Sequence, residues 1–130
     1  MNQSRRGGSH GTESSVLQGC LNVLGLYEVP AWRNNTGAFA GVYQGRRRFI
    51  RFGLQGSSDI LGIVPFGGCG RMLAVECKNG RGKLADSQRA FLRNVQAAGG
   101  VAVVVRDPRR LIEVLELLKI DPWHAVEIGE

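Results

Sequence analysis

Two acidic residues and a lysine occur in the most apolar, strand-like part of this chain. Asp59 opens one apolar run, and Glu76 and Lys78 end a second run that follows a glycine-rich turn. Charged groups in such surroundings are costly unless they are paired or hold a metal ion. Carboxylates suit Mg²⁺ or Mn²⁺, which keep positions for water and a phosphate. The chemistry indicated is hydrolysis of a phosphodiester bond, in which Lys78 orients the attacking water or balances charge.

The run that ends at Lys78 has two different faces. Side chains alternate along a strand, so Glu76 and Lys78 point to one face while Leu73, Val75 and Cys77 point to the other. We therefore expect one face to pack a core and the other to carry the chemistry, with the backbone carbonyl of Cys77 as a further metal ligand. A plain surface salt bridge between Glu76 and Lys78 is the simpler alternative.

Two strands, at residues 59–64 and 72–78, must bring the acids together. The connection between them is short and holds three glycines, so it favours antiparallel pairing over a parallel crossover. A short edge strand is expected at residues 29–33, since Pro30 is excluded from central ladder positions. The β-branched run at residues 101–105 suits a strand that is buried on both faces.

Helices are expected before, between and after these strands. The first covers residues 12–26, and Glu13 lies on its apolar stripe, where it either favours the helix dipole or reaches into a site. The second begins with Asp86 or Ser87 as its cap, and Gln88 on its inner side can point toward the acids. The third opens at residues 107–108, where an aspartate and a proline form an N-cap and first turn.

The order of these elements predicts one α/β domain. A central mixed sheet is flanked by helices in the order α-β-β-β-α-β-α, and 130 residues suffice for one such domain with a real core. The domain is expected over residues 12–119. Residues 1–11 are interpreted as a disordered basic arm and residues 120–130 as a C-terminal tail without a clear period.

The positive charge of the chain is clustered. Seventeen Lys and Arg against eleven Asp and Glu give a net charge of +6, and arginines are interleaved with aromatic residues at residues 43–51. Such a surface favours a polyanion, with nucleic acid first, although small soluble proteins are also basic for solubility alone. For residues 38–52 the alternative is a solvated hairpin whose charges protect an edge strand. The clusters are Arg5 and Arg6, Arg46 to Arg48 with Arg51, Arg81 with Lys83, and Arg106 with Arg109 and Arg110.

The cysteines and the apolar runs indicate a reducing, non-membrane setting. Cys20, Cys69 and Cys77 have no spacing typical of a disulfide framework or a zinc site, and Cys20 and Cys77 are expected to be buried thiols. No apolar run approaches the length of a membrane span, and the polar start lacks the apolar middle of a secretory signal. A cytoplasmic location without a membrane partner is the expectation.

The combination of Asp59 with Glu76-Cys77-Lys78 resembles the signature of the PD-(D/E)XK nuclease superfamily, with Ser58 where that signature often has proline. Within it, the chain resembles the VRR-NUC family, the virus-type replication-repair nucleases, over residues 12–118. The residues that carry this resemblance are Glu13, residues 32–37, residues 53–62, residues 76–78 and residues 88–92.

The resemblance implies a restriction-endonuclease-like core and a Mg²⁺- or Mn²⁺-dependent DNA endonuclease. Small stand-alone members, found in phages and prophages, are similar to Holliday-junction resolvases and tend to be homodimers. They point to branched or structured DNA as the substrate, in phage DNA replication, recombination or repair within the host cytoplasm. A flap- or duplex-directed nuclease, and a DNA-binding protein that keeps the fold without turnover, are the alternatives.

The resemblance also assigns roles to particular residues. Asp59, Glu76 and the carbonyl of Cys77 stay the direct metal ligands, Glu13 becomes a ligand behind them or through water, and Gln88 becomes an orienter of phosphate or water near Lys78. Asn34 and Asn35 either contact the DNA backbone or shape a turn. The residues expected to contact DNA, chiefly at its phosphates, are Arg33, Asn34, Asn35, Arg46, Arg47, Arg48, Arg51 and Lys83.

Overall fold

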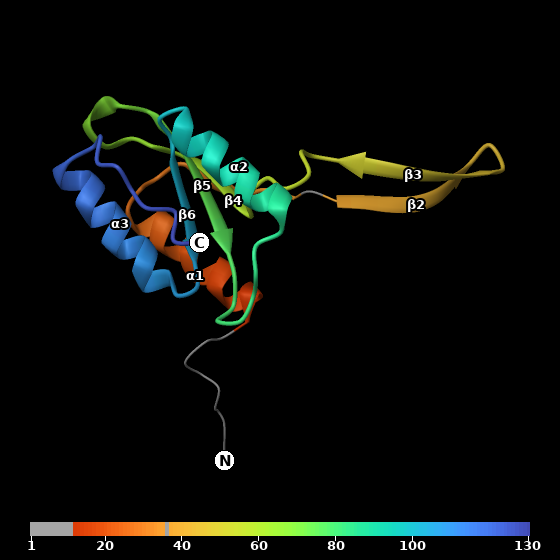
Figure 1. Cartoon of the computed structure of the whole chain (residues 1–130), viewed down its shortest axis with the longest axis horizontal. Coiled ribbons are helices and arrows are strands. Elements are labelled where there is room, and N and C mark those ends of the chain that lie inside the picture. Colours follow the sequence, from red (N-terminus) through yellow and green to blue (C-terminus); the bar gives the residue numbers. More distant parts are fainter. Residues whose placement is uncertain (1–11, 36) are drawn as a thin grey trace, which may run out of the picture.

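A computed structural model describes residues 12–35 and 37–130 of the chain. Within these residues a four-stranded sheet lies between α1 and α3 on one face and α2 on the other, and a separate hairpin projects from the body (Figure 1). The predicted arm at residues 1–11 lies outside the described part. The elements are α1 (Glu13–Leu26), β1 (Ala31–Arg33), β2 (Gly37–Tyr43), β3 (Arg46–Phe52), β4 (Ile60–Val64), the short 3-10 helix η1 (Phe66–Gly68), β5 (Arg71–Cys77), α2 (Asp86–Ala97), β6 (Val101–Val105) and α3 (Pro108–Ile120).

The main sheet is mixed. Its strand order is β1-β4-β5-β6, in which β4 is antiparallel to both β1 and β5, and β6 is parallel to β5. The α/β class and the antiparallel pairing of β4 with β5 are therefore confirmed, and β1 is an edge strand as expected. The helices and the strands of this sheet follow the predicted order, and the hairpin inserts β2 and β3 between β1 and β4.

Each face of the sheet has its own core. The larger cluster joins α1 and α3 to the side chains of Leu73, Val75 and Cys77. On the opposite face a smaller cluster joins α2, through Leu92 among others, to Ala74 of β5. The expectation that one face packs and the other carries chemistry therefore needs refinement, since the face of Glu76 is also packed over part of its length. All five residues of β6 are buried, as its β-branched sequence predicts.

The helix starts follow side-chain capping, with one correction. Asp107 caps α3 by accepting a hydrogen bond from the Arg109 N–H, and Pro108 occupies the first turn, as predicted. The prediction that Asp86 or Ser87 caps α2 is wrong, because the helix already begins at Asp86. Its N-cap residue has no polar side chain, and the Gln88 Oε1 accepts the exposed backbone N–H of that residue at 2.8 Å instead.

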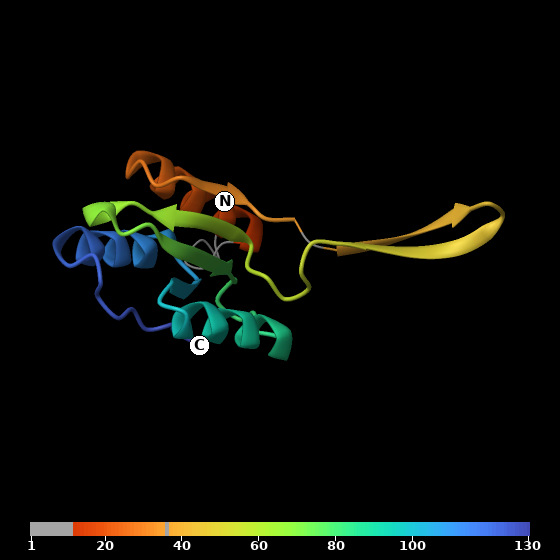
Figure 2. The same cartoon turned by 90° about the horizontal axis from the view of Figure 1, so that it is seen from above.

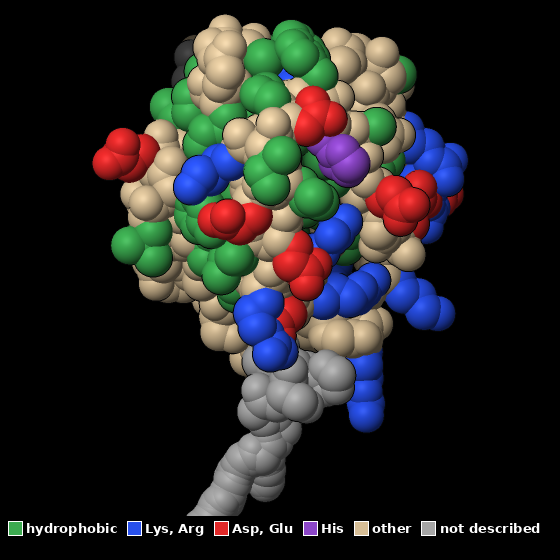
Figure 3. All heavy atoms as spheres, turned by 90° about the vertical axis from the view of Figure 1, so that its left-hand side faces the viewer, with side chains coloured by type: hydrophobic (Ala, Val, Ile, Leu, Met, Phe, Trp, Pro, Cys, Tyr) green, Lys and Arg blue, Asp and Glu red, His purple; other side chains and the backbone are tan. Residues whose placement is uncertain are grey.

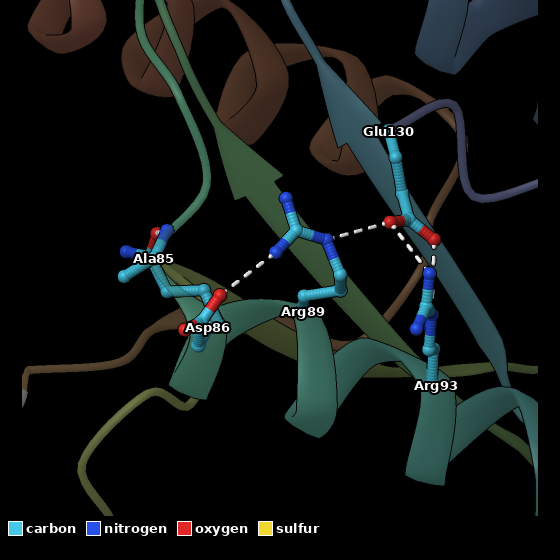
Figure 4. Close-up of polar contacts among 6 residues, drawn as sticks. Ala85, Asp86, Arg89, Arg93 and Glu130 are labelled. Carbon is cyan, nitrogen blue, oxygen red and sulfur yellow. Dashed lines mark hydrogen bonds and ion pairs between the residues drawn. The ribbon is translucent and has the colours of Figure 1, made fainter.

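Residues 121–130 pack against the body. Val126 and Ile128 are buried, and the N–H of Val104 in β6 donates to the carbonyl oxygen of Ile128 at 2.8 Å. Glu130 lies between two arginines of α2, Arg89 and Arg93, and forms an ion pair with each (Figure 4). The segment interpreted as a tail therefore covers β6 and α2.

A buried arginine ties this segment to the sheet. Arg71, at the start of β5, is 8% exposed and donates to the carbonyl oxygens of Gly99, Pro122 and His124 at 2.8 to 3.0 Å. Buried donors and acceptors need such partners, because an unpaired one keeps its full desolvation cost. One guanidinium thus satisfies carbonyls from two separate segments.

Strands β2 and β3 form a hairpin that stands away from the body (Figures 1 and 2). Its register runs from Gly37 opposite Phe52 to Tyr43 opposite Arg46. Gln44 and Gly45 form the turn with φ of 52° and 75°, and positive φ at both central residues is the type I′ geometry that suits a two-residue hairpin. Among the described residues, β2 and β3 make extensive contacts only with each other.

The helices are short. Within residues 12–35 and 37–130, none has the length and apolar character needed to cross a bilayer.

Candidate active site

Glu76 is the most buried acid of the predicted set, at the end of β5. It is 2% exposed, and its Oε2 accepts a hydrogen bond from the Gln88 Nε2 at 3.2 Å. The Nζ of Lys78 lies 3.7 Å from the same oxygen, and Lys78 is also buried. The pair is therefore not the exposed surface salt bridge that was the simpler alternative. The structure brings the three predicted residues together at one carboxylate.

The surroundings of Glu76 favour its protonated form. Burial is the largest cause, followed by the negative charge of Asp59 and a hydrogen bond with that carboxyl group, and together they raise the pKa of Glu76 from 4.5 to about 8. Lys78 acts in the opposite direction and Glu13 adds a smaller increase. Two carboxyl groups are thus held close together with too little positive charge to keep both ionised.

Asp59 is fixed by backbone hydrogen bonds from β5 and from the residue after β1. Its Oδ2 accepts the N–H of Cys77 at 2.8 Å, and its carbonyl oxygen accepts the N–H of Asn34 at 2.7 Å. The side chain of Asn34 donates to the Ser57 Oγ at 2.7 Å and to the Ser58 carbonyl oxygen at 3.0 Å. The amide of Asn34 therefore shapes the loop before Asp59, which is one of its two predicted roles.

Glu13 and Asp59 both line a cavity of about 180 Å³. Arg33 at the end of β1 and Cys77 at the end of β5 line the same cavity, so α1, β1, β5 and the residue before β4 contribute to it. Glu13 is exposed and makes up the first residue of α1. Its place in the cavity wall supports the second of its two predicted roles, in which it reaches into a site.

The loop after Lys78 is held by an arginine that the sequence reasoning did not assign to the site. Arg106, directly after β6, donates to the carbonyl oxygens of Asn79 at 2.8 Å and Gly82 at 2.7 Å. Gly82 lies against the Lys78 side chain, since a Cβ there would come within 3.2 Å of the lysine Cδ. The signal available in the sequence was an arginine immediately after a fully buried strand, which indicates a structural role for its guanidinium.

The other predicted DNA contacts lie on several separate elements. Arg33 is in the cavity wall, and Asn35 and Lys83 are exposed on loops. Arg46 and Arg47 are exposed beside the turn of the hairpin. The backbone of Arg48 and Arg51 belongs to β3, but their side chains lie outside the described part.

The donor set suits a hard divalent cation with few protein ligands. Asp59 and Glu76 supply two neighbouring carboxyl groups, and a cation between them would offset the charge that raises the pKa of Glu76. No three Asp, Glu, His or Cys side chains in residues 12–35 and 37–130 are grouped closely enough to hold a metal ion. Glu13 shares a cavity wall with Asp59, and its contact with a cation through water stays a prediction.

The thiol of Cys77, next to these acids, is buried and is held in its protonated form. Cys77 is 1% exposed, and a hydrogen bond with the fully buried Cys20, together with burial, raises its thiol pKa above the ordinary value. Both cysteines are free thiols in the core, as predicted. Ser58, beside Asp59, is also buried, and its Oγ has no hydrogen-bond partner in the described part of the chain.

Comparison of the chain with protein-family models, with curated proteins and with solved structures found no match.

Proposed function

We propose that this protein is a Mg²⁺- or Mn²⁺-dependent endodeoxyribonuclease that hydrolyses phosphodiester bonds in branched or structured DNA. The observation that carries the proposal is the contact of Glu76 with both Gln88 and Lys78, beside the carboxyl group of Asp59. A purely structural role explains this group poorly, because a buried acid beside a second carboxyl group destabilises a fold unless a cation or a proton compensates the charge.

Each residue of the group has a role in the proposed reaction. Asp59, Glu76 and the carbonyl of Cys77 would hold the cation, which would supply positive charge for the phosphate and make water more acidic. The Lys78 ammonium orients the attacking water or stabilises charge on the phosphate oxygens. Gln88 holds the Glu76 carboxylate in place, and Glu13 contacts the site through water.

The resemblance to VRR-NUC proteins adds three further parts to the proposal. The core is of the restriction-endonuclease type, the substrate is a four-way junction or a related branched DNA, and the working form is a homodimer active in phage DNA replication, recombination or repair. A homodimer would bring two sites and a wider basic surface to one junction. Light scattering at the protein concentration of the assay measures the mass, and a monomer would remove the dimer from the proposal.

Cleavage assays test the activity directly. A labelled four-way junction and a linear duplex of the same sequence are incubated with the protein in Mg²⁺, in Mn²⁺ and in EDTA. We expect cleavage with either metal, more rapid on the junction, and none in EDTA. Binding to both DNAs without cleavage in any metal would contradict the proposed activity and support the non-catalytic alternative, whereas preferential cutting of flaps or duplex would change the substrate.

A further inference from the structure

In the part of the chain that the structure describes, strands β2 and β3 make extensive contacts only with each other. Two-stranded ribbons are marginally stable in isolation. A hairpin that projects from the body therefore gains stability when it binds a partner. Figures 1 and 2 show it extending beyond the body in both views, with its root beside β1 and β4.

The charge of the hairpin identifies the kind of partner. Residues 37–52 contain four arginines and no Asp or Glu, although the whole chain has eleven acidic residues. By contrast, acidic and basic side chains lie side by side on the end of the body that faces away from the hairpin (Figure 3). A second copy of this chain carries a net charge of +6 and would repel this arm, so the proposed homodimer would form through another surface. A polyanion is the complementary partner.

The root of the hairpin is attached to the candidate active site. β1 ends at Arg33, which lines the cavity, and the chain returns from β3 to Asp59 within a short loop. The hydrogen bond from the Asn34 N–H to the Asp59 carbonyl oxygen joins the outgoing and returning segments. The root of the hairpin therefore lies beside Arg33 and Asp59.

We infer that the hairpin lies in the major groove of a DNA duplex next to the scissile phosphate, with Arg46 and Arg47 near the far end of the contact. This inference rests on the proposed function in that it takes DNA as the partner. A two-stranded ribbon fits the major groove, about 12 Å wide, whereas the minor groove, about 6 Å wide, is too narrow for it. Strands of seven residues extend about 24 Å. At about 3.4 Å per base pair, this length covers about 7 base pairs.

The first test measures binding in EDTA, so that no cutting is needed. Each phosphate contact contributes about 0.9 to the slope of log K against log salt concentration, so Arg46→Gln/Arg47→Gln should lower that slope by about 1.8. The matched control Arg93→Gln/Lys119→Gln removes the same charge from α2 and α3 and should lower it by less than half as much. Equal slopes for the two double variants would overturn the inference, as would equal binding of poly-glutamate and duplex by the intact chain.

The second test identifies the groove. Methyl green, which occupies the major groove, should displace the intact chain from duplex DNA at lower concentration than netropsin, which occupies the minor groove. A chain in which Gly-Ser-Gly replaces residues 37–52 should bind more weakly and lose this difference. Stronger displacement by netropsin would overturn the inference, and the arginine variants still decide it if the shortened chain does not fold.

The third test separates the hairpin from the chemistry. For the intact chain, cleavage should fall at least tenfold when the duplex arm beside the cut is shortened below about 7 base pairs, which is the length of duplex that the hairpin spans. The variant lacking residues 37–52 should show no such threshold. An active enzyme with no threshold and no salt-slope effect refutes the hairpin inference alone. A protein that cuts no DNA but gives the expected slopes and displacement refutes the proposed activity alone.

Discussion

The Nε2 of Gln88 donates a hydrogen bond to the Oε2 of Glu76 at 3.2 Å, and the Oε1 of Gln88 accepts one from the backbone N–H of Ala85 at 2.8 Å. One side chain thereby closes the start of α2 and fixes the carboxylate at the end of β5. The helix cannot shift along the sheet without moving the buried acid, so the fold and the candidate site share a hydrogen bond.

Two substitutions at Gln88 separate these two functions. Gln88→Glu keeps an acceptor for the Ala85 N–H but places a second negative charge against Glu76, so we expect near-normal stability and about a 10- to 100-fold loss of cleavage. The Gln88→Glu variant should also need a higher Mg²⁺ or Mn²⁺ concentration for its half-maximal cleavage rate. Gln88→Ala should also destabilise the fold by about 1 kcal/mol, through loss of the cap. Metal titrations of the cleavage rate and urea unfolding measure the two effects.

The control for Gln88 is Asn94→Ala, an exposed position on the same helix. Its cleavage rate and metal requirement should match those of the intact chain. If Gln88→Glu behaved as the control does, the amide of Gln88 would have no role beyond capping.

Removal of Asp59 or Lys78 should stop cleavage for different reasons. Asp59→Ala loses a carboxylate ligand and should bind Mn²⁺ weakly, whereas Lys78→Ala keeps both acids and should bind it at least as well as the intact chain. Each should reduce cleavage by about 10² or more. Calorimetric Mn²⁺ titration and single-turnover cleavage measure the two properties.

Asp86→Ala controls for the loss of one acidic residue, since the Asp86 side chain is fully exposed in the first turn of α2. It should bind Mn²⁺ normally and remain active. Full activity of Asp59→Ala or of Lys78→Ala would refute the site assignment.

The raised pKa of Glu76 predicts a pH-dependent stability in the absence of metal. Because the folded-state pKa, about 8, is above the ordinary value of 4.5, the unfolded chain releases this proton first as the pH rises. The free energy of unfolding should therefore fall between pH 4.5 and about 8 and show no further loss from this group above that range. Thermal unfolding in EDTA across this range measures it.

Metal should reverse that loss. Mn²⁺ competes with the proton for the carboxylates, so the stabilisation it gives should grow as the pH rises toward the pKa of Glu76, about 8. Glu76→Gln, which cannot ionise, should flatten both dependences. A Glu76→Gln protein with the same pH profile and the same Mn²⁺ response as the intact chain would show that another group titrates.

Arg71→Met tests the anchor of residues 121–130. The substitution keeps much of the side-chain volume but leaves the carbonyl oxygens of Gly99, Pro122 and His124 without their donor. We expect a loss of about 3 kcal/mol in the free energy of unfolding and faster proteolysis within residues 121–130. Arg110→Met, on the side of α3, should cost less than about 0.5 kcal/mol. A loss equally small for Arg71→Met would contradict the anchoring role.

The sheet elements and the convergence of Glu76, Lys78 and Gln88 could be predicted because each depends on local periodicity. Alternation placed Glu76 and Lys78 on one face, and helical spacing turned Gln88 inward. Arg71 and Arg106 were missed as anchors, since their partners are carbonyl oxygens distant in sequence and a carbonyl leaves no mark in the residue type. The projection of the hairpin was also unpredictable, because alternation in β3 is the same whether or not another element covers it.

Ile128 covers part of one edge of the main sheet. Its carbonyl oxygen takes the N–H of Val104, so the C-terminal residues occupy part of the outer side of β6, while β1 at the other side is only three residues long. Unpaired strand margins invite other chains to add strands and aggregate. Residues 121–130 thus hinder self-association by strand pairing at β6. Strands β2 and β3 are longer than β1, and each pairs with the other alone among the described strands.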